Sequence, residues 1–471
     1  MLKLLNTLTN QKEELIPIKN KHIGMFVCGP TVYDYSHIGH ARTYVVFDVI
    51  AKYLRYKGHK VNFVMNITDI DDKIIARARE ENRNWKEVAE FYEKAFMEDI
   101  KSLGIDSVDK FARATVHIPQ IINQIKTLVE KGYAYQTEDG IYFDISKFED
   151  YGKLAKRTVE QAEDSVSRVD ESINKRNKGD FALWRLSEDL PAQAGEPAWD
   201  SPWGKGRPGW HIEDTAISEK YLGQRYEIHC GARDLTFPHH EAEIAQQEAA
   251  SGKKPFVKYW LHSGFVTVNG QKMSKSLKNF ITIRDLLKEY SPEALRFMVL
   301  SSHYRSPIDY KEDLFKQSEA AIQRISELMD KLETIKKSGS KAEKVEMDEI
   351  IKNTGLEFES KMDDDFNTPE ALAVLFNFIR IANGIISDNT LDKKSAVRVL
   401  KFLKEMDEIF GIIKEKSEIP EDIRQLVQKR EELRKEKAWL EADKIRDEIQ
   451  AKGYLVDDTP YGPFIKKNSK L

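Results

Sequence analysis

The fold is decided by residues 22–72, HIGMFVCGPTVYDYSHIGHARTYVVFDVIAKYLRYKGHKVNFVMNITDIDD. Residues 22–28 are apolar and β-branched enough for a buried strand, which the pair Gly29-Pro30 ends. A helical pattern follows over 38–57, and a second strand over 61–67 leads into an acidic turn. Because strands that alternate with helices form βαβ units, this stretch predicts a parallel sheet.

The same pattern returns later in the chain after an interruption. Residues 140–210 are rich in Gly, Pro, Trp and charge, and they predict an insertion or a set of loops over a site. A strand over 226–230 and a helix over 239–250 resume the sheet, and Asn269-Gly270 predicts a two-residue hairpin turn. From about residue 292 the pattern is helical, with a polar linker at 336–347, a bundle at 348–413 and one densely charged helix at 421–451.

The composition excludes several classes of protein. The 471 residues are 41% hydrophobic, which excludes wholesale disorder, and 74 Lys and Arg against 78 Asp and Glu give a net charge of −4. A uniformly basic nucleic-acid-binding protein is therefore excluded, although a local basic face is not. Two cysteines exclude a disulfide scaffold and suit a reducing compartment. We find neither a signal peptide nor an apolar run near the roughly 18 residues of a membrane span, so we expect a multi-domain cytoplasmic enzyme.

The motif His37-Ile38-Gly39-His40 stands at the expected start of the first helix. A helix N-terminus offers free N–H groups and the positive end of its dipole, and both favour phosphate. Two imidazoles one turn apart add donors for charge that develops on phosphorus, and Gly39 lets a flat ring such as adenine approach the backbone. A histidine pair that only caps an ordinary helix accounts for these four residues equally well.

A second phosphate signal is the stretch Lys272-Met273-Ser274-Lys275-Ser276, which follows the hairpin and precedes a helix. Its lysines and hydroxyls suit a polyphosphate, although alone it is more typical of a solvated basic turn. Taken together, the two motifs predict a cleft whose two sides close on one ATP.

Three residues indicate a metal site. His239 and Glu243 are spaced i, i+4 on a helix and face the same way, and Cys28 ends the first strand. Cys, His and Glu are all ligands that zinc accepts. A single Cys at the end of a strand is nevertheless more often an ordinary core residue.

Several longer motifs occur along the chain, namely FVCGPTVYDYSHIGHART, NITDIDDKI, PAWDSPWGKGRPGWHIE, DLTFPHHEAEIAQ, KMSKSLKNF and WLEADKIRDEI. In this order they resemble the cysteinyl-tRNA synthetases, a family of class I aminoacyl-tRNA synthetases, over nearly the whole chain. The resemblance implies an α/β fold: a Rossmann-like parallel-sheet catalytic domain with an insertion, an all-α helical bundle and a small C-terminal tRNA-binding unit. It also implies a monomer that joins cysteine to tRNA(Cys) with ATP and Mg²⁺ and needs no membrane.

The resemblance also implies a division of the chain. The two halves of the catalytic domain are 1–115 and 221–291, the insertion is 116–220, the helical stem-contact region and linker are 292–345, the bundle is 346–415, and the anticodon-binding unit is 416–471.

The family's metal site would hold one Zn²⁺ per subunit. The resemblance implies that Cys28, His239, Glu243 and a cysteine directly after the WHIE motif bind the metal, and that the thiolate of the substrate cysteine then joins them. This chain departs from the pattern, because Asp214 follows WHIE. Three possibilities stay open: Asp214 is a ligand, Cys230 takes over from a position where the family usually has glycine, or the metal is weak or absent.

Other roles follow from the same resemblance. The catalytic residues on the phosphates would be His37, His40, Lys272 and Lys275, and the ATP-binding residues would be Gly39, His40, Lys275 and Ser276. The amino-acid pocket would contain Thr68, Trp210 and Asp234, with Asp234 near the substrate ammonium. The tRNA-binding residues would be Arg434, Trp439 and Asp443, which we expect on one helix with Arg430.

Two alternative functions also stay open. One is a ligase that joins cysteine to a small amine, although such relatives lack the C-terminal tail that this chain keeps. The other is a non-catalytic tRNA-binding paralogue, which only the departure at Asp214 favours.

Overall fold

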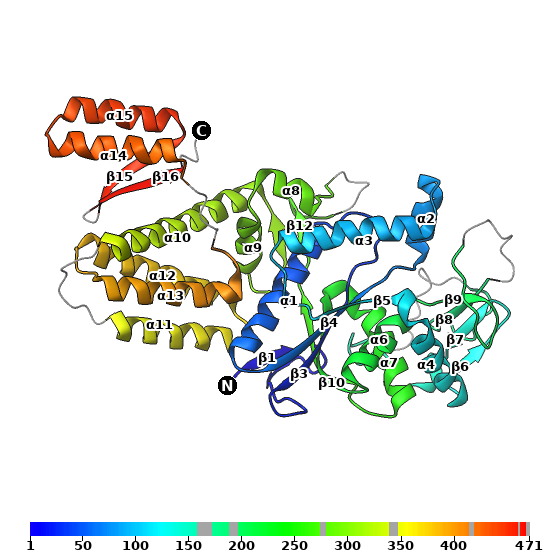
Figure 1. The fold of residues 1–471 in the computed structure, drawn as a ribbon. Coiled ribbons are helices and arrows are strands. Elements are labelled where there is room, and N and C mark those ends of the chain that lie inside the picture. Colours follow the sequence, from blue (N-terminus) through cyan, green and yellow to red (C-terminus); the bar gives the residue numbers. More distant parts are fainter. Residues whose placement is uncertain are drawn as a thin grey trace. The chain divides into compact units, whose positions relative to one another are not determined.

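The structure is a computed structural model that describes residues 1–157, 172–187, 196–273, 279–338, 347–413, 419–459 and 462–467. It contains two compact units (Figure 1). Unit 1 comprises Met1–Pro292, Ser302–Lys311 and Asp363–Asn367, and unit 2 comprises Glu293–Ser301, Glu312–Met362 and Thr368–Leu471. The finer six-part division stays a prediction.

Unit 1 is built on a five-stranded parallel sheet in the order β11-β10-β3-β4-β5. The strands are β3 (His22–Val27), β4 (Lys60–Ile67), β5 (Lys110–Arg113), β10 (Tyr226–Ala232) and β11 (Val257–Ser263). The predicted βαβ arrangement is therefore confirmed. Because the strands are parallel, the residues that follow β3, β4 and β10 gather at one edge of the sheet, where such sheets place their ligands.

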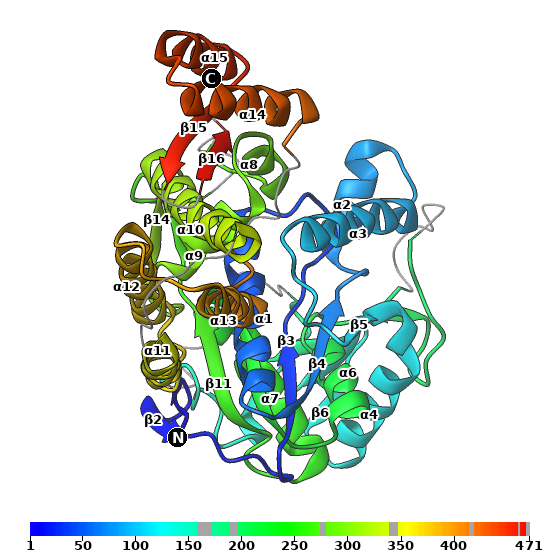
Figure 2. The same ribbon diagram turned by 60° about the vertical axis from the view of Figure 1, so that its left-hand side comes forward.

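Helices cover both faces of this sheet (Figure 2). The helix α1 (Ile38–Tyr56) packs against β4, β10 and β11 on one face. On the other face lie α6 (Ile212–Leu222) and α7 (His239–Ser251), and the apolar cluster they form with the sheet includes Phe26 and Val64. The polar residues that begin α1 and α7 are thereby brought to the carboxyl edge of the sheet.

The insertion contains more regular structure than the sequence indicated. It forms α4 (Ile118–Glu130) and a four-stranded antiparallel sheet of β6 (Ala134–Gln136), β7 (Gly140–Phe143), β8 (Phe181–Leu186) and β9 (Gly206–Pro208). Residues 140–210 are thus not simply a set of loops. These strands are three to six residues long, too short for alternation of apolar and polar residues to stand out.

The hairpin predicted at Asn269-Gly270 is confirmed. Strands β12 (Val266–Val268) and β13 (Gln271–Lys272) pair antiparallel, and both turn residues have positive φ, 52° and 76°.

The remaining elements of unit 1 are β1 (Lys3–Asn6), β2 (Gln11–Glu14), α2 (Asp72–Glu81), α3 (Trp85–Ser102), η1 (Ala114–His117), η2 (Ile145–Lys147), η3 (Arg233–Thr236), α8 (Ile283–Glu289) and β14 (Ile308–Tyr310).

Unit 2 contains the predicted helical bundle. Its helices are α9 (Pro292–Leu300, which begins at the end of unit 1), α10 (Glu312–Ser338), α11 (Met347–Met362), α12 (Thr368–Ser387) and α13 (Lys393–Phe410). Within the described residues, α12 alone is long and apolar enough to cross a membrane, although the sequence had indicated no such stretch. Its residues Leu372, Leu375 and Phe378 are buried in the bundle, and a core helix passes the same test.

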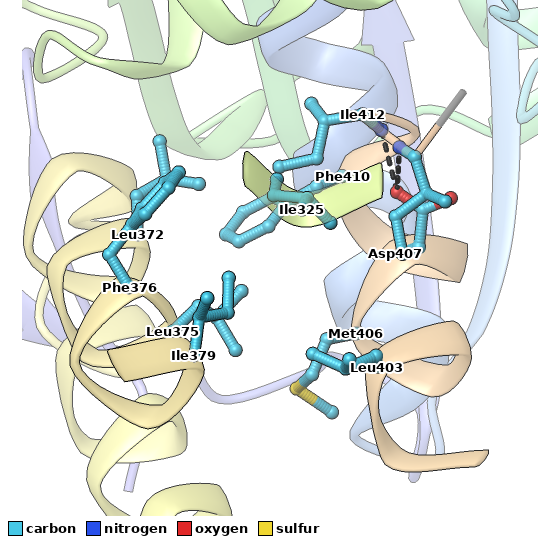
Figure 3. Close-up of a pocket in the computed structure, with 11 residues that line it drawn as sticks. Ile325, Leu372, Leu375, Phe376, Ile379, Leu403, Met406, Asp407, Phe410 and Ile412 are labelled. Carbon is cyan, nitrogen blue, oxygen red and sulfur yellow. Dashed lines mark hydrogen bonds between the residues drawn. The ribbon is translucent and has the colours of Figure 1, made fainter. Parts of the chain in front are cut away.

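A small apolar pocket lies between α10, α12 and α13 of the bundle (Figure 3). Its volume is about 20 Å³, which is room for a single water molecule. The Asp407 carboxylate at its rim accepts hydrogen bonds from the backbone N–H groups of Ile412 and Ile413. The pocket is therefore a gap in the packing rather than a ligand site.

The densely charged C-terminal helix is in fact two helices, so the prediction of one helix over 421–451 is wrong. The helices are α14 (Glu421–Lys435) and α15 (Trp439–Ala451), which pair with each other and precede the hairpin of β15 (Tyr454–Thr459) and β16 (Gly462–Lys467). The chain turns where Lys437 adopts φ of 63°. No Gly or Pro marks the turn, and folding back lets Val427 and Ile449 share one core cluster.

Candidate active site

Four potential metal ligands converge at the carboxyl edge of the sheet. Cys28 follows β3, Asp214 lies on α6, and His239 and Glu243 lie on the first turns of α7. Their ligand atoms are all within 4.8 Å of one another. His239 Nε2 is 3.1 Å from Asp214 Oδ2 and 3.0 Å from Glu243 Oε1. The structure thus brings together the four residues that sequence analysis named for the metal, including the unusual aspartate.

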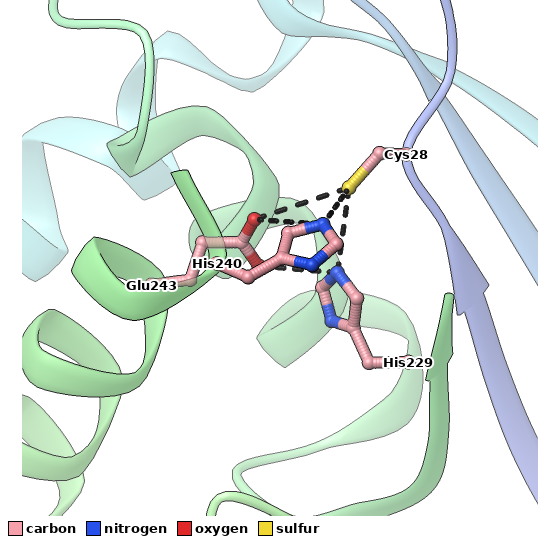
Figure 4. Close-up of side chains that lie close together, drawn as sticks. All are labelled: Cys28, His229, His240 and Glu243. Atoms are coloured by element: carbon pink, nitrogen blue, oxygen red, sulfur yellow. Dashed lines mark hydrogen bonds and ion pairs between the residues drawn. The ribbon is translucent and has the colours of Figure 1, made fainter. Parts of the chain in front are cut away.

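A second group shares Cys28 and Glu243 with the first and adds two histidines, His229 of β10 and His240 of α7 (Figure 4). Their Nε2 atoms lie 3.4 and 3.1 Å from Cys28 Sγ. Sequence analysis missed His229. His229 precedes Cys230 in a strand, so the two side chains face opposite sides of the sheet, but the sequence does not say which side faces Cys28.

The same alternation explains the position of Cys230. In the parallel register His229 pairs with Phe26, whereas Cys230 pairs with Val27, so the Cys230 thiol faces the opposite side of the sheet. Among the described residues, both potential metal-binding groups leave Cys230 out. The geometry therefore favours Asp214 over Cys230 as the replacement for the missing cysteine.

The electrostatics of the first group suit a cation. Burial, reinforced by the Asp214 and Glu243 carboxylates, raises the pKa of the Cys28 thiol well above its usual range. Burial and the neighbouring Asp214 and Glu213 likewise raise the pKa of Glu243. A divalent cation would take the place of the protons that these acidic groups otherwise hold. In addition, Glu243 Oε2 is buried and makes no hydrogen bond within the described part of the chain, and His229 Nε2 lies 3.3 Å from it. A thiolate, an imidazole and two carboxylates form a donor set that zinc accepts.

The histidines around this group are held in fixed orientations. His239 Nδ1 is 2.8 Å from His211 Nδ1, His229 Nδ1 is 2.7 Å from the Tyr226 hydroxyl, and His240 Nδ1 is 2.8 Å from His262 Nε2. Burial lowers the pKa of His211, His229 and His240, and it lowers the pKa of His262 to about 3. Neutral imidazoles anchored through one nitrogen are typical of a metal site.

The predicted ATP-binding histidines lie together at the start of α1. His37 caps the helix, its Nδ1 accepting a hydrogen bond from the Gly39 backbone N–H at 3.0 Å, and His40 Nδ1 accepts from the His37 N–H at 3.3 Å. The two rings stack with centroids 3.9 Å apart. A Cβ on Gly39 would lie 2.8 Å from the His37 ring, which is too close. The position of this ring is therefore enough to require glycine at residue 39. The role of Gly39 toward adenine stays a prediction.

The second phosphate motif lies only partly within the described residues. Ser274, Lys275 and Ser276 are outside them, as is the side chain of Lys272, whose backbone ends β13. The residues just before and just after the undescribed segment 274–278 lie close to His37 and to the first residues of α1. Met273 approaches Gly39, Phe280 packs edge-on against the His37 ring at 5.2 Å, and the Ile38 N–H donates to the Ile281 carbonyl at 3.1 Å. The described residues that precede and follow 274–278 thus lie at the start of α1.

Burial of His37 makes stability depend on pH. Burial lowers the pKa of His37 from 6.5 to about 4, although the Asp234 and Asp34 carboxylates oppose this shift. Between these pH values the unfolded chain binds the proton and the folded protein does not, so stability falls as the pH falls. From pH 7 to pH 5 we expect the free energy of unfolding to drop by about 2 kcal/mol more in the wild type than in His37→Gln, measured by urea unfolding. Equal losses in the two proteins would contradict this assignment.

Two of the three residues predicted for the amino-acid pocket lie beside the group of Cys28, Asp214, His239 and Glu243. The Trp210 ring stacks on the His239 ring with centroids 4.5 Å apart. Thr68 is buried, and its hydroxyl donates to Glu213, the neighbour of Asp214. Asp234 is exposed on η3 and close enough to act electrostatically on His37. Thr68 and Trp210 therefore lie beside the first group of potential metal ligands, while Asp234 lies toward the histidines predicted to bind ATP.

The predicted tRNA-binding residues lie in the C-terminal part of unit 2. Arg434 lies on the last turn of α14. Its guanidinium is 5.6 Å from the centre of the ring of Trp439, a residue at the start of α15 that is 55% exposed. Asp443 lines an open cavity of about 590 Å³. Arg430 is buried and holds Asp458 through two hydrogen bonds of 2.8 and 3.0 Å, so it stabilises the unit instead of facing a ligand.

Three family models match the chain in succession. The class I (C) tRNA synthetase catalytic domain matches residues 14–320, the DALR domain matches 357–414, and the cysteinyl-tRNA ligase anticodon binding domain matches 416–462. The first match alone covers more than half of the chain. The resemblance inferred from sequence motifs is thereby confirmed.

Curated relatives and solved structures agree with these models. The cysteine–tRNA ligase of Thermococcus onnurineus is 47% identical over 99% of both chains, and that of Thermodesulfovibrio yellowstonii is 46% identical over 98% of both. A methionyl-tRNA synthetase of Mycobacterium tuberculosis, solved with methionyl-adenylate, shares the fold with a TM-score of 0.61 and 16% identity, covering 82% of this chain and 88% of that one. From these matches together, the chain belongs to the cysteine–tRNA ligases, a family of ATP-dependent class I aminoacyl-tRNA synthetases.

Proposed function

We propose that this protein activates cysteine with ATP and transfers it to the 3′ end of tRNA(Cys), and that Zn²⁺ held by Cys28, Asp214, His239 and Glu243 selects the substrate. The observation that carries the proposal is the convergence of these four side chains at the sheet edge where His37 caps α1 and His40 lies on its first turn. The choice of this group over the one with His229 and His240 is supported by the neighbouring Thr68 and Trp210, which the family places in the amino-acid pocket.

When bound, Zn²⁺ supplies a Lewis acid that favours the thiolate of cysteine over the much more basic hydroxyl of serine. The protein's own residues provide the remaining selection. Trp210 is stacked on His239 and forms a wall beside the ligands. Since a pocket that only fits shape and apolar surface discriminates by at most a few hundredfold, a dedicated thiolate ligand removes the need for an editing step.

Adenylate formation needs positioning more than proton transfer. The carboxylate of cysteine is already ionised at neutral pH and attacks the α-phosphate of ATP without a general base. Burial lowers the pKa of both His37 and His40, so both act as neutral hydrogen-bond donors to the phosphates. In this proposal Lys272, Lys275 and Ser276 bind the pyrophosphate as it leaves, with Mg²⁺ accompanying ATP. The 2′-hydroxyl of the terminal adenosine of tRNA then attacks the carbonyl carbon of the adenylate, loses its proton and releases AMP.

The anticodon is bound by the C-terminal unit in this proposal. Trp439 is exposed and backed by the Arg434 guanidinium, an arrangement on which an unpaired base can stack. Asp443 faces the neighbouring cavity and can accept a hydrogen bond from a base edge.

Arg434→Ala should weaken tRNA charging while leaving cysteine activation unchanged. Loss of one stacking or base-edge contact costs about 1–3 kcal/mol, so we expect kcat/KM for tRNA to fall about 5- to 150-fold. The measurement is aminoacylation of transcribed tRNA(Cys), with cysteine-dependent ATP–pyrophosphate exchange as the reference reaction. Arg424→Ala, an exposed arginine on the first turn of α14, is the matched control. Normal charging by Arg434→Ala would remove this residue from the anticodon site.

The function itself is tested by two assays on the wild-type protein. We expect cysteine-dependent ATP–pyrophosphate exchange and charging of tRNA(Cys), with about one zinc per chain and a monomer in solution. Exchange without charging would favour a ligase that joins cysteine to a small amine. Binding of tRNA without exchange would favour a non-catalytic paralogue. A cytoplasmic location is part of the same proposal, because the substrates of translation are there.

A further inference from the structure

Asp214, the aspartate among the four potential metal ligands, is held in place by the side chain of Asn66. Asn66, which is 2% exposed near the end of β4, donates from Nδ2 to Asp214 Oδ1 at 2.6 Å. Its Oδ1 accepts a hydrogen bond from the Gly29 backbone N–H, also at 2.6 Å. Asn66 thereby connects the backbone beside Cys28 to the carboxylate of Asp214.

The direction of these hydrogen bonds is fixed by the groups around Asn66. The Gly29 N–H can only donate, so the amide oxygen must face it and the amide nitrogen must face Asp214. The second N–H of the amide points to Thr68 Oγ1 at 3.3 Å, and the Thr68 hydroxyl in turn donates to Glu213. With both donors and the acceptor in use, the side chain has a single satisfied orientation.

This orientation gives the two oxygens of Asp214 different surroundings. Oδ1 accepts the hydrogen bond from Asn66, whereas Oδ2 faces His239 Nε2 at 3.1 Å, inside the group of four ligands. Asp214 is 1% exposed, so its oxygens have no water to bond, and the Asn66 amide supplies Oδ1 with a hydrogen-bond donor. A cysteine at this position would offer a single sulfur atom and no second oxygen to satisfy.

We propose that Asn66 is the positioning residue that makes Asp214 serviceable as a metal ligand, by fixing its carboxylate so that Oδ2 alone is presented to the metal. The inference rests on the proposed metal-dependent function. It explains how the chain tolerates an aspartate where the family pattern has cysteine, and it predicts that the importance of Asn66 depends on which residue occupies position 214.

The test is a double-mutant cycle between positions 66 and 214. Asn66→Leu keeps the approximate volume of the side chain and removes its hydrogen bonds, and it is made in the wild type and in Asp214→Cys. The readout is the zinc dissociation constant, from competition with a chromophoric chelator, together with the visible absorption of the Co²⁺-loaded proteins. Loss of the Gly29 hydrogen bond is common to both backgrounds and cancels.

We expect Asn66→Leu to weaken zinc binding about 10- to 100-fold in the wild type, and by no more than about twofold in Asp214→Cys. The Co²⁺ bands should shift only in the wild-type background. Asn62→Leu, an exposed asparagine on the same strand β4, is the matched control and should leave zinc affinity unchanged. If Asn66→Leu does not fold, judged by its thermal unfolding, Asn66→Ser replaces it in both backgrounds.

Equal losses in the two backgrounds would show a structural role and overturn this inference while the proposed function stands. A wild-type protein that binds no zinc would overturn both.

Discussion

Cys28→Ala should lose zinc and, with it, the preference for cysteine. The thiolate is the only sulfur donor in the group, and Cys28 Sγ lies within 4.8 Å of the ligand atoms of Asp214, His239 and Glu243. Structural zinc sites gain about 10–16 kcal/mol from four ligands, so removal of one should weaken zinc binding about 100- to 1,000-fold. The measurements are zinc content by mass spectrometry and ATP–pyrophosphate exchange with cysteine and with serine.

The matched control for this substitution is Cys230→Ala. It removes the same atom from an equally buried cysteine whose side chain faces the other side of the sheet. It should therefore keep full zinc and full discrimination, at the modest cost in stability of a small cavity. If Cys28→Ala retained full zinc and cysteine activation, or if Cys230→Ala lost them, the assignment of the ligands would be wrong.

His40→Asn should lower kcat for adenylate formation by about 100- to 1,000-fold. This is the usual effect of losing one hydrogen-bond donor to the negative charge that develops in the transition state. The His40 Nδ1 is occupied by the His37 backbone N–H, so the outward nitrogen Nε2 carries the proton that a phosphate would accept. An asparagine can keep the capping contact but is too short to reach as far. The loss should therefore appear in kcat for pyrophosphate exchange, while zinc content stays at the wild-type level.

His22→Asn is the control for this substitution, because His22 is an exposed histidine at the start of β3 whose ring Nδ1 lies 2.9 Å from the Asn20 carbonyl oxygen. It should leave exchange unchanged. A His40→Asn protein with normal kcat would mean that the histidine pair only caps α1, the alternative that the four-residue motif left open.

The parts of the fold that could be predicted are those in which one local pattern points to one structure. The alternation of strand and helix over 22–67 and the Asn269-Gly270 turn are of this kind, since each depends on neighbouring residues. The break between α14 and α15 could not be predicted in this way. The chain turns at Lys437 because Val427 and Ile449 pack together, and a charged sequence without Gly or Pro does not reveal such a tertiary contact.

The residues of the candidate site also fall into those that a local pattern reveals and those that only a tertiary contact reveals. Cys28, His239 and Glu243 could be named from ligand chemistry and from the i, i+4 spacing, and Asp214 because it stands where a cysteine was expected. His229 and Asn66 could not, since their contacts with Cys28 and Asp214 join residues more than 140 positions apart. Those contacts depend on the register of the parallel strands, which a single sequence does not specify.

The division into two units has a practical consequence for anyone who wishes to work with the catalytic part alone. Unit 1 takes its last segment, Asp363–Asn367, from far along the chain, between α11 and α12. Within that segment Asp365 accepts hydrogen bonds from the Leu5 N–H at 2.8 Å and from the Tyr304 hydroxyl at 2.9 Å. A fragment cut after residue 311 would leave both donors without their acceptor. The segments of the two units alternate along the sequence, so a single cleavage of the chain cannot separate one complete unit from the other.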